Sequence, residues 1–164
     1  RQRCEAFYAA FESEFSTATF QHIGDWLENG VRNWAHTDVL CGEVLSVFFK
    51  KGICGLEDLS SWCVSPSKWK RRAVPVAMLE LVKDEANVEP LLAFIDPMML
   101  DSERFVHQGL GWFLREAWKR QPQPVERFLL KWKDTAPRKI FQYATEKMTK
   151  EQRARYRAKR KQKK

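Results

Sequence analysis

The sequence lacks several features that would place it in common protein classes. No apolar run approaches the roughly 20 residues that span a bilayer, and the start of the chain, Arg1 to Glu5, has no signal-peptide pattern. The cysteines, at positions 4, 41, 54 and 63, form no CxxC pair. We therefore expect a cytoplasmic protein of bacterial type, with reduced and mostly buried thiols and no membrane partner.

The short motifs of many enzyme classes are also missing. The chain has no glycine-rich loop to cradle phosphates, no Ser or Cys nucleophile motif and no cofactor fingerprint. His36, Asp38 and Cys41 are close enough in sequence for a metal site, but no second cluster completes a set of four ligands. We therefore predict a function without metal or organic cofactor.

Net positive charge is absent outside the C-terminal end. The net charge is +8, but residues 138–164 hold 12 Lys and Arg against two acids, which leaves 17 basic against 19 acidic residues in 1–137. We expect a domain of residues 1–149 followed by a basic tail or helical extension of residues 150–164. Such a tail suits neutralisation of nucleic-acid phosphates, and a solvated helical extension explains the same composition.

Apolar residues at helical spacing are abundant. No stretch alternates apolar and polar residues long enough to predict a strand, so the predicted fold class is all-α, with a core for one domain. Helices are expected with Cys4, Phe7, Phe11 and Phe15 on one face, with Leu40, Val44, Val47 and Phe48 on one face before Gly52, and over residues 67–83, 88–95, 102–120, 122–132 and 137–144.

Aromatic residues recur near the starts of these helices. They lie at Trp34, Trp69, Phe105 and Phe141, at intervals of 35, 36 and 36 residues. Periods of roughly 30–47 residues are typical of helical solenoids. Because the Trp, Leu-Gly and Tyr pattern of tetratricopeptide repeats is missing, we predict a HEAT-like solenoid of stacked antiparallel helix pairs with short connections.

Three segments match one known family in order and spacing. Trp34-x-x-x-Asp38 opens a predicted helix, Trp69-Lys70-Arg71-Arg72 opens another, and residues 105–116 read Phe-x-x-x-x-x-Gly-Trp-x-Leu-Arg-Glu. Together they resemble the AlkD-type DNA alkylation repair family, a HEAT-like group of DNA glycosylases. The resemblance covers most of the chain, from Trp34 to Tyr143.

The resemblance implies an enzyme that hydrolyses the N-glycosidic bond of N3- or N7-alkylated purines in double-stranded DNA. It assigns the catalytic surface to Trp34, Asp38, Arg72 and Trp112. An alkylated purine is cationic and leaves readily, so Asp38 would stabilise the developing sugar cation. Trp34 and Trp112 would attract the cationic base through their ring faces, and Arg72 would hold a DNA phosphate.

The resemblance also implies that the protein acts as a monomer on DNA and that further cations contact phosphates. The predicted DNA-binding residues are Lys68, Lys70, Arg71, Arg72 and Arg115. Taken alone, the predicted catalytic and DNA-binding residues also fit ordinary structural roles. Arg115 can pair with Glu116 or Asp101, the two tryptophans fit a helix core, and Asp38 fits the start of a helix.

Two features depart from the family, and two other functions stay open. Only 33 residues precede Trp34 and there is no initiator Met, so we expect that N-terminal helices of the family are missing. Pro75 would interrupt its helix unless that helix starts late, near Arg72. The alternatives are a non-catalytic protein that binds branched or distorted DNA by shape and charge, and a HEAT-like scaffold for protein interactions.

Overall fold

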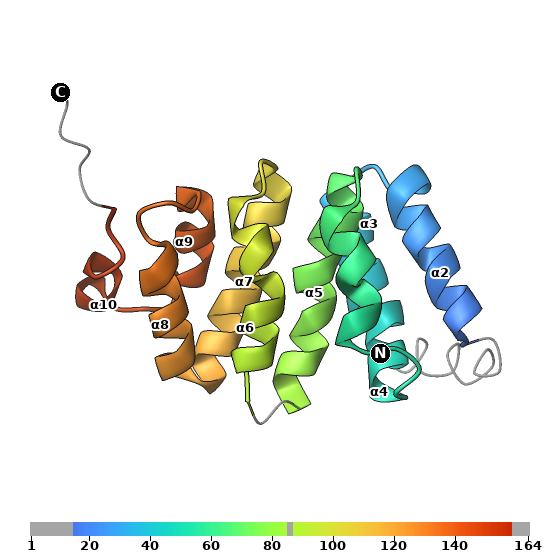
Figure 1. The fold of residues 1–164 in the computed structure, drawn as a ribbon, viewed down its shortest axis with the longest axis horizontal. Coiled ribbons are helices and arrows are strands. Elements are labelled where there is room, and N and C mark those ends of the chain that lie inside the picture. The colour runs from blue at the N-terminus through green and yellow to red at the C-terminus, as the bar shows by residue number, and fades with distance from the viewer. Residues whose placement is uncertain (1–14, 85–86, 159–164) are drawn as a thin grey trace. The chain divides into compact units, whose positions relative to one another are not determined.

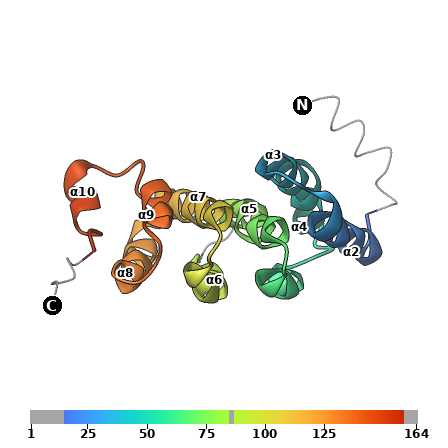
Figure 2. The same cartoon turned by 90° about the horizontal axis from the view of Figure 1, so that it is seen from above.

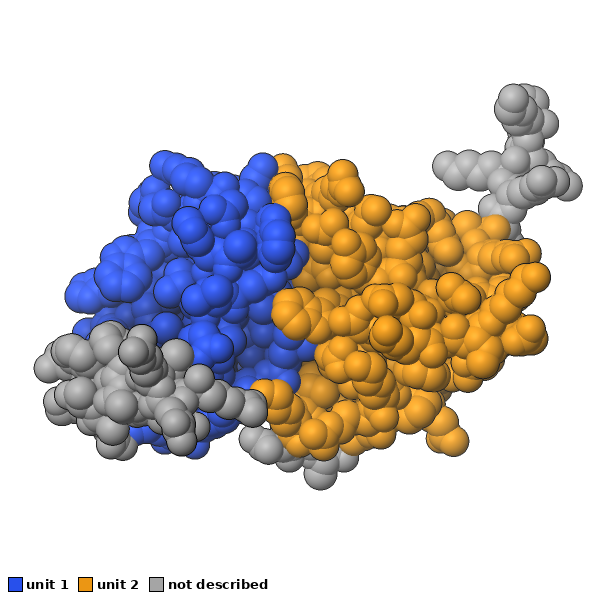
Figure 3. All heavy atoms as spheres, turned by 180° about the vertical axis from the view of Figure 1, so that it is seen from behind, with its two compact units in different colours: residues 1–81 blue, residues 82–164 orange. Residues whose placement is uncertain are grey.

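The computed structural model describes residues 15–84 and 87–158, and every regular element within these ranges is helical (Figure 1). The all-α prediction is therefore confirmed. The chain divides into two compact units, Arg1–Leu81 and Val82–Lys164 (Figure 3). The helix predicted from Cys4, Phe7 and Phe11 lies outside the described residues. No described helix combines the length and the apolar character that crossing a membrane requires.

The first unit is built from capped helices that widen into π-helical turns. Helix α2 (Thr17–Asp25) begins at Ser16, whose hydroxyl accepts from the Thr19 N–H at 3.3 Å, and it continues as a π-helical turn, Trp26–Gly30. Helix α3 (Trp34–Val39) runs through a second π-helical segment into α4. The remaining segments are π-helical Leu40–Leu45, α4 (Ser46–Lys50), the 3-10 helix Leu56–Val64 and α5 (Lys68–Asp84).

The π-helical segment shifts the buried face of the α3–α4 stretch from the predicted one. Phe48 is buried as predicted, but Leu40, Val44 and Val47 are only half-buried. The residues that fill the core instead are Thr37, Cys41, Leu45, Phe48 and Phe49. A π turn holds more residues than an α turn, so a stripe projected with the α-helical period loses phase across it. The predicted end at Gly52 is confirmed by its positive φ of 64°.

Helix α5 begins directly after Ser67, as the prediction for residues 67–83 has it, and it contains Pro75. The late start near Arg72 that would have accommodated Pro75 is not adopted. Ser67 satisfies the first turn instead: its hydroxyl accepts from the Lys70 N–H at 3.4 Å and its carbonyl accepts from the Arg71 N–H at 3.0 Å. Pro75 lacks an N–H and removes one helical hydrogen bond. Residues 72–78 are all buried, so packing of this segment outweighs the lost bond.

The second unit contains two layers of helices. Its elements are α6 (Glu89–Ile95), a 3-10 turn (Asp96–Leu100), α7 (Arg104–Arg120), α8 (Pro122–Trp132), α9 (Arg138–Ala144) and α10 (Lys150–Ala154). Helices α6 and α8 form one layer, and α7 and α9 form the other (Figure 2). Helix α7 packs against both α8 and α9. The predicted boundary at residue 150 falls within this unit, at the start of α10.

The aromatic period marks the starts of helices, as predicted. Trp34 is the first residue of α3, Trp69 and Phe105 are the second residues of α5 and α7, and Phe141 lies in the first turn of α9. Trp69 and Phe141 are buried, whereas Trp34 is exposed. The repeat therefore reflects a common start of each helix, and one of its members faces solvent.

Candidate active site

Helix α3 presents Trp34 and Asp38 on one face. Asn33 caps the helix, and its Oδ1 accepts from the His36 N–H at 3.0 Å. Trp34 and Asp38 are four residues apart, so they lie one above the other on the helix surface. Trp34 is 52% exposed, which excludes the core role that its apolar stripe allowed. An exposed indole therefore stands one turn before a carboxylate.

The Asp38 carboxylate is held by Arg72 of α5. The guanidinium Nε donates to Oδ1 at 2.9 Å and Nη2 donates to Oδ2 at 2.9 Å, a two-point contact that fixes both position and plane. The Arg72 side chain is 5% exposed and that of Asp38 is 16% exposed. The predicted residues Asp38 and Arg72 are thus brought together, but Arg72 faces the carboxylate from a buried position.

The carboxylate keeps capacity for further contacts. Its two oxygens offer about four lone-pair sites, and Arg72 uses one on each oxygen. Because Asp38 remains partly exposed, the other sites can face a water molecule or a positive charge from solvent. The arrangement is suited to stabilising a cation or orienting water.

Cys41 lies one turn after Asp38, and its side chain is almost completely buried. Its Sγ donates to the Ala73 carbonyl at 3.6 Å, and burial, with a further contribution from the Asp38 carboxylate, raises the pKa of the thiol far above its usual range. A protonated thiol neither attacks nor binds metal well. In residues 15–84 and 87–158, no group of three or more His, Cys, Asp or Glu side chains is placed to hold a metal ion.

The other described thiols are free as well. Cys54 is buried and Cys63 is half-buried, and neither forms a disulfide. Burial raises the pKa of each of these thiols to about 11. Both therefore stay protonated at neutral pH and, like Cys41, are poor nucleophiles.

The other cations predicted in this unit have partners within the chain. The Lys70 ammonium lies 2.6 Å from Glu28 Oε2, and its hydrogen bond lowers the pKa of the Glu28 carboxyl. Arg71 Nη1 donates to the Ser65 carbonyl at 2.7 Å. Lys68 Nζ lies 5.3 Å from the centroid of the Trp69 ring. A phosphate contact at these positions would replace or share an existing contact.

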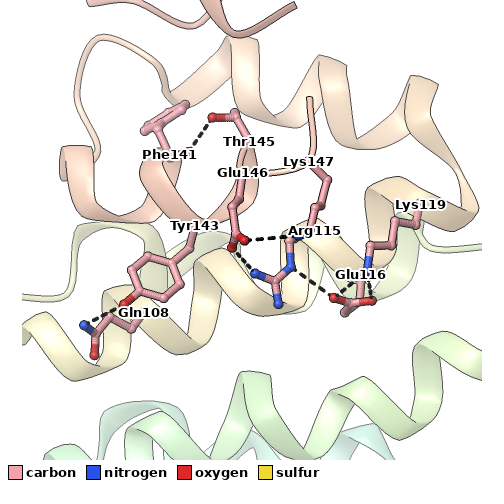
Figure 4. Close-up of polar contacts among 9 residues, drawn as sticks. All are labelled: Gln108, Arg115, Glu116, Lys119, Phe141, Tyr143, Thr145, Glu146 and Lys147. Carbon is pink, nitrogen blue, oxygen red and sulfur yellow. Dashed lines mark hydrogen bonds and ion pairs between the residues drawn. The ribbon is translucent and has the colours of Figure 1, made fainter. Parts of the chain in front are cut away.

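In the second unit, Trp112 lies half-buried on the exposed side of α7. The residues that share its helix face by spacing are Gln108, Arg115, Glu116 and Lys119. Figure 4 shows that the side chains of Tyr143 and Glu146 reach this part of α7 from α9 and from the residues just after it. Trp112 thus belongs to a polar surface of the second unit.

Arg115 is shared between two carboxylates. Its Nε donates to Glu116 Oε1 at 3.1 Å, which confirms the pairing with Glu116 that the sequence allowed, and its Nη1 contacts Glu146 Oε2 (Figure 4). Lys119 lies 2.8 Å from Glu116 and Lys147 lies 3.4 Å from Glu146. Three cations and two carboxylates therefore form one network on this surface, with a net charge of +1.

Several residues around these sites were not predicted from the sequence. The partners Glu28 and Glu146 lie far from Lys70 and Arg115 in sequence, and no local pattern pairs them. The proximity of Asp38 and Arg72 could have been found from the aromatic repeat. Asp38 lies four residues after Trp34 and Arg72 lies three residues after Trp69, so both lie at a similar level of their helices. Gln108, four residues before Trp112, could have been found from the α7 face alone.

One comparison with known proteins bears on most of the chain. The model of a family described as DNA alkylation repair enzyme matches residues 3–148. Comparisons with curated proteins and with solved structures gave no match. The matched range contains Trp34, Asp38, Arg72 and Trp112, and it ends before α10.

Proposed function

Because this chain belongs to the DNA alkylation repair enzyme family, we propose that it is a DNA glycosylase that hydrolyses the N-glycosidic bond of N3- or N7-alkylated purines in double-stranded DNA. Membership of the family gives the chain a role in the repair of alkylated DNA. The observation that carries the finer proposal is the exposed Trp34 beside a partly exposed Asp38 whose two oxygens are fixed by Arg72.

Asp38 is the residue to which we assign chemistry. Alkylation at N3 or N7 makes the purine cationic, so the bond between the sugar C1′ and the base nitrogen breaks with its electron pair moving to the base, which leaves as a neutral molecule. The sugar carries the positive charge that develops. A carboxylate beside C1′ stabilises that charge and orients the water whose oxygen bonds to C1′, while the water's proton passes to the carboxylate or to solvent.

We propose that Arg72 positions Asp38 and does not clamp a phosphate. Its guanidinium is buried and commits two N–H groups to the carboxylate. A phosphate would have to displace that contact, leaving the partly exposed Asp38 carboxylate without its cation. The two-point contact instead fixes the direction of Asp38 before the substrate arrives, which lowers the cost of organising the site during the reaction.

The indoles supply faces for the substrate. Trp34 is exposed and needs no rearrangement to meet a ligand, and its ring attracts a cationic base by about 0.5–2 kcal/mol. We assign the same contribution to Trp112, which lies half-buried in the second unit. The proposal also includes phosphate contacts by Lys68, Lys70, Arg71 and Arg115. Each of these cations would contact DNA as well as its present partner within the chain.

Binding of DNA without catalysis is the second candidate. The observation that favours it is the Asp38–Arg72 contact itself, since a two-point ion pair between α3 and α5 also serves as a purely structural bridge. Incubating the protein with duplex DNA that contains 7-methylguanine separates the two functions. The proposal predicts free 7-methylguanine, measured by chromatography, above the spontaneous release from the same DNA. Salt-sensitive binding with no release above that background would support the binding protein.

A further inference from the structure

Tyr143 lies directly against the α7 backbone next to Trp112. A Cβ atom built on Gly111 would lie 2.5 Å from Tyr143 Cβ and 2.6 Å from the Ile140 carbonyl oxygen. The absence of a side chain at Gly111 therefore lets α9 approach α7 closely. The base of the Tyr143 side chain is fixed beside the residue that precedes Trp112.

The hydroxyl group of Tyr143 accepts a hydrogen bond and can also donate one. Gln108 Nε2 donates to the Tyr143 hydroxyl oxygen at 3.1 Å (Figure 4). A tyrosine hydroxyl accepts and also donates, and its O–H meets no acceptor in the described part of the chain. Gln108 orients the hydroxyl, and the hydrogen bond between these two half-buried side chains is only partly buried.

The cations on the same face are already paired. Arg115 contacts Glu116 and Glu146, and Lys119 contacts Glu116 again. A phosphate that met Arg115 or Lys119 would have to compete with a carboxylate. A phosphate that met Tyr143 would form a hydrogen bond without breaking one, because the hydroxyl's existing bond uses its oxygen as the acceptor.

We propose that the Tyr143 hydroxyl donates a hydrogen bond to a backbone phosphate oxygen of the DNA strand beside Trp112, and that Gln108 orients that hydroxyl. The inference rests on the proposed function in taking DNA as the ligand. Tyr143 is a positioning residue: it sets the register of the duplex against Trp112 and carries no sequence information.

Tyr143→Phe tests the contact by removing only the hydroxyl. The dissociation constant for undamaged duplex DNA, measured by fluorescence anisotropy, should rise about three- to tenfold. The slope of log affinity against log salt should stay unchanged, because a neutral donor releases no counterion. Gln142→Ala, an exposed neighbour on α9, is the matched control and should bind as the wild type does.

A phosphate-by-phosphate scan makes the test specific. Replacing single phosphates with uncharged methylphosphonates should reveal a position that weakens wild-type binding and has no further effect on Tyr143→Phe, because coupled partners do not add. Gln108→Ala, which keeps the hydroxyl but frees its orientation, should weaken binding by about two- to threefold, with an unchanged thermal midpoint.

Two results would overturn the inference: a Tyr143→Phe variant that binds within twofold of the wild type, or one that keeps full sensitivity to every methylphosphonate. Since binding is read on undamaged DNA, where no base is released, a failure of the glycosylase proposal leaves this measurement intact. Base release by the wild type with no effect of Tyr143→Phe would reject the inference alone.

Discussion

Arg72 of α5 holds both carboxylate oxygens of Asp38 on α3, through Nε and Nη2, at 2.9 Å each. The guanidinium is almost completely buried, whereas the carboxylate is partly open to solvent. One side of the ion pair is therefore structural and the other side is available to a ligand. This asymmetry separates the role of Arg72 from that of Asp38 and determines how their variants should differ.

Arg72→Lys should impair catalysis more than binding. Lysine keeps the charge but loses the planar two-point contact, so Asp38 shifts or rotates. Since misplacement by about 1 Å can cost about a hundredfold in rate, we expect single-turnover base release to fall about ten- to hundredfold with little change in DNA affinity. Arg127→Lys, a change in an exposed pair with Glu89, is the control. A reduced salt slope with an unchanged rate would indicate a phosphate clamp instead.

Trp34→Ala should slow base release without destabilising the fold. The side chain is largely exposed, so the free energy of unfolding in urea should change by no more than about 0.5 kcal/mol. Loss of an interaction with the cationic base should reduce the rate about two- to thirtyfold. Trp26→Ala is matched to it, since Trp26 is 59% exposed in the same unit. Equal effects of the two variants would remove Trp34 from the site.

Gly111→Ala should destabilise the second unit. The added methyl would meet Tyr143 Cβ at 2.5 Å and the Ile140 carbonyl oxygen at 2.6 Å, and neither can move without separating α7 from α9. We expect a loss of about 1–3 kcal/mol in chemical denaturation. Gly42→Ala is the control, because nothing lies within 4 Å of its new Cβ and alanine favours a helix. A neutral Gly111→Ala would show that the close approach is not required.

The starts of the helices could be predicted from sequence, because helix starts are encoded by neighbouring residues. Ser67, Pro122 and Pro137 lie at or beside the predicted starts of their helices. The buried face of α3 and α4 could not be predicted, because a π-helical segment changes the period within the stretch. The position of Pro75 inside α5 could not be predicted either, because the packing of the buried residues 72–78 outweighs the helical hydrogen bond that proline removes.

The residue types of the candidate site could also be predicted, but their contacts could not. The spacing of Trp34 and Asp38 on one helix is a local property, and the structure retains it. The partner of Arg72 depends on how α3 packs against α5, which no short motif specifies. An arginine near the carboxylate was therefore predictable from the Trp-Lys-Arg-Arg segment, whereas its contact with Asp38 follows only from the tertiary structure.

The basic C-terminal residues should strengthen DNA binding without affecting the choice of lesion. A truncation for this test should end at Ala158, because Tyr156 is 1% exposed and Arg155 pairs with Glu126 at 2.8 Å. Removing residues 159–164 takes away five Lys and Arg. Affinity should fall on all duplexes, and the salt slope should decrease by about 0.9 for each phosphate that these cations neutralise. An unchanged slope would show that the cations do not touch DNA.

The most direct measurement is base release from 7-methylguanine DNA by Asp38→Asn, with enzyme in excess and the DNA saturated. Asparagine keeps the size of the side chain and one acceptor for Arg72 but removes the negative charge that stabilises the sugar cation. We predict that release falls by about a hundredfold or more while the dissociation constant for DNA stays close to that of the wild type. Release at the wild-type rate by Asp38→Asn would contradict the role of this carboxylate.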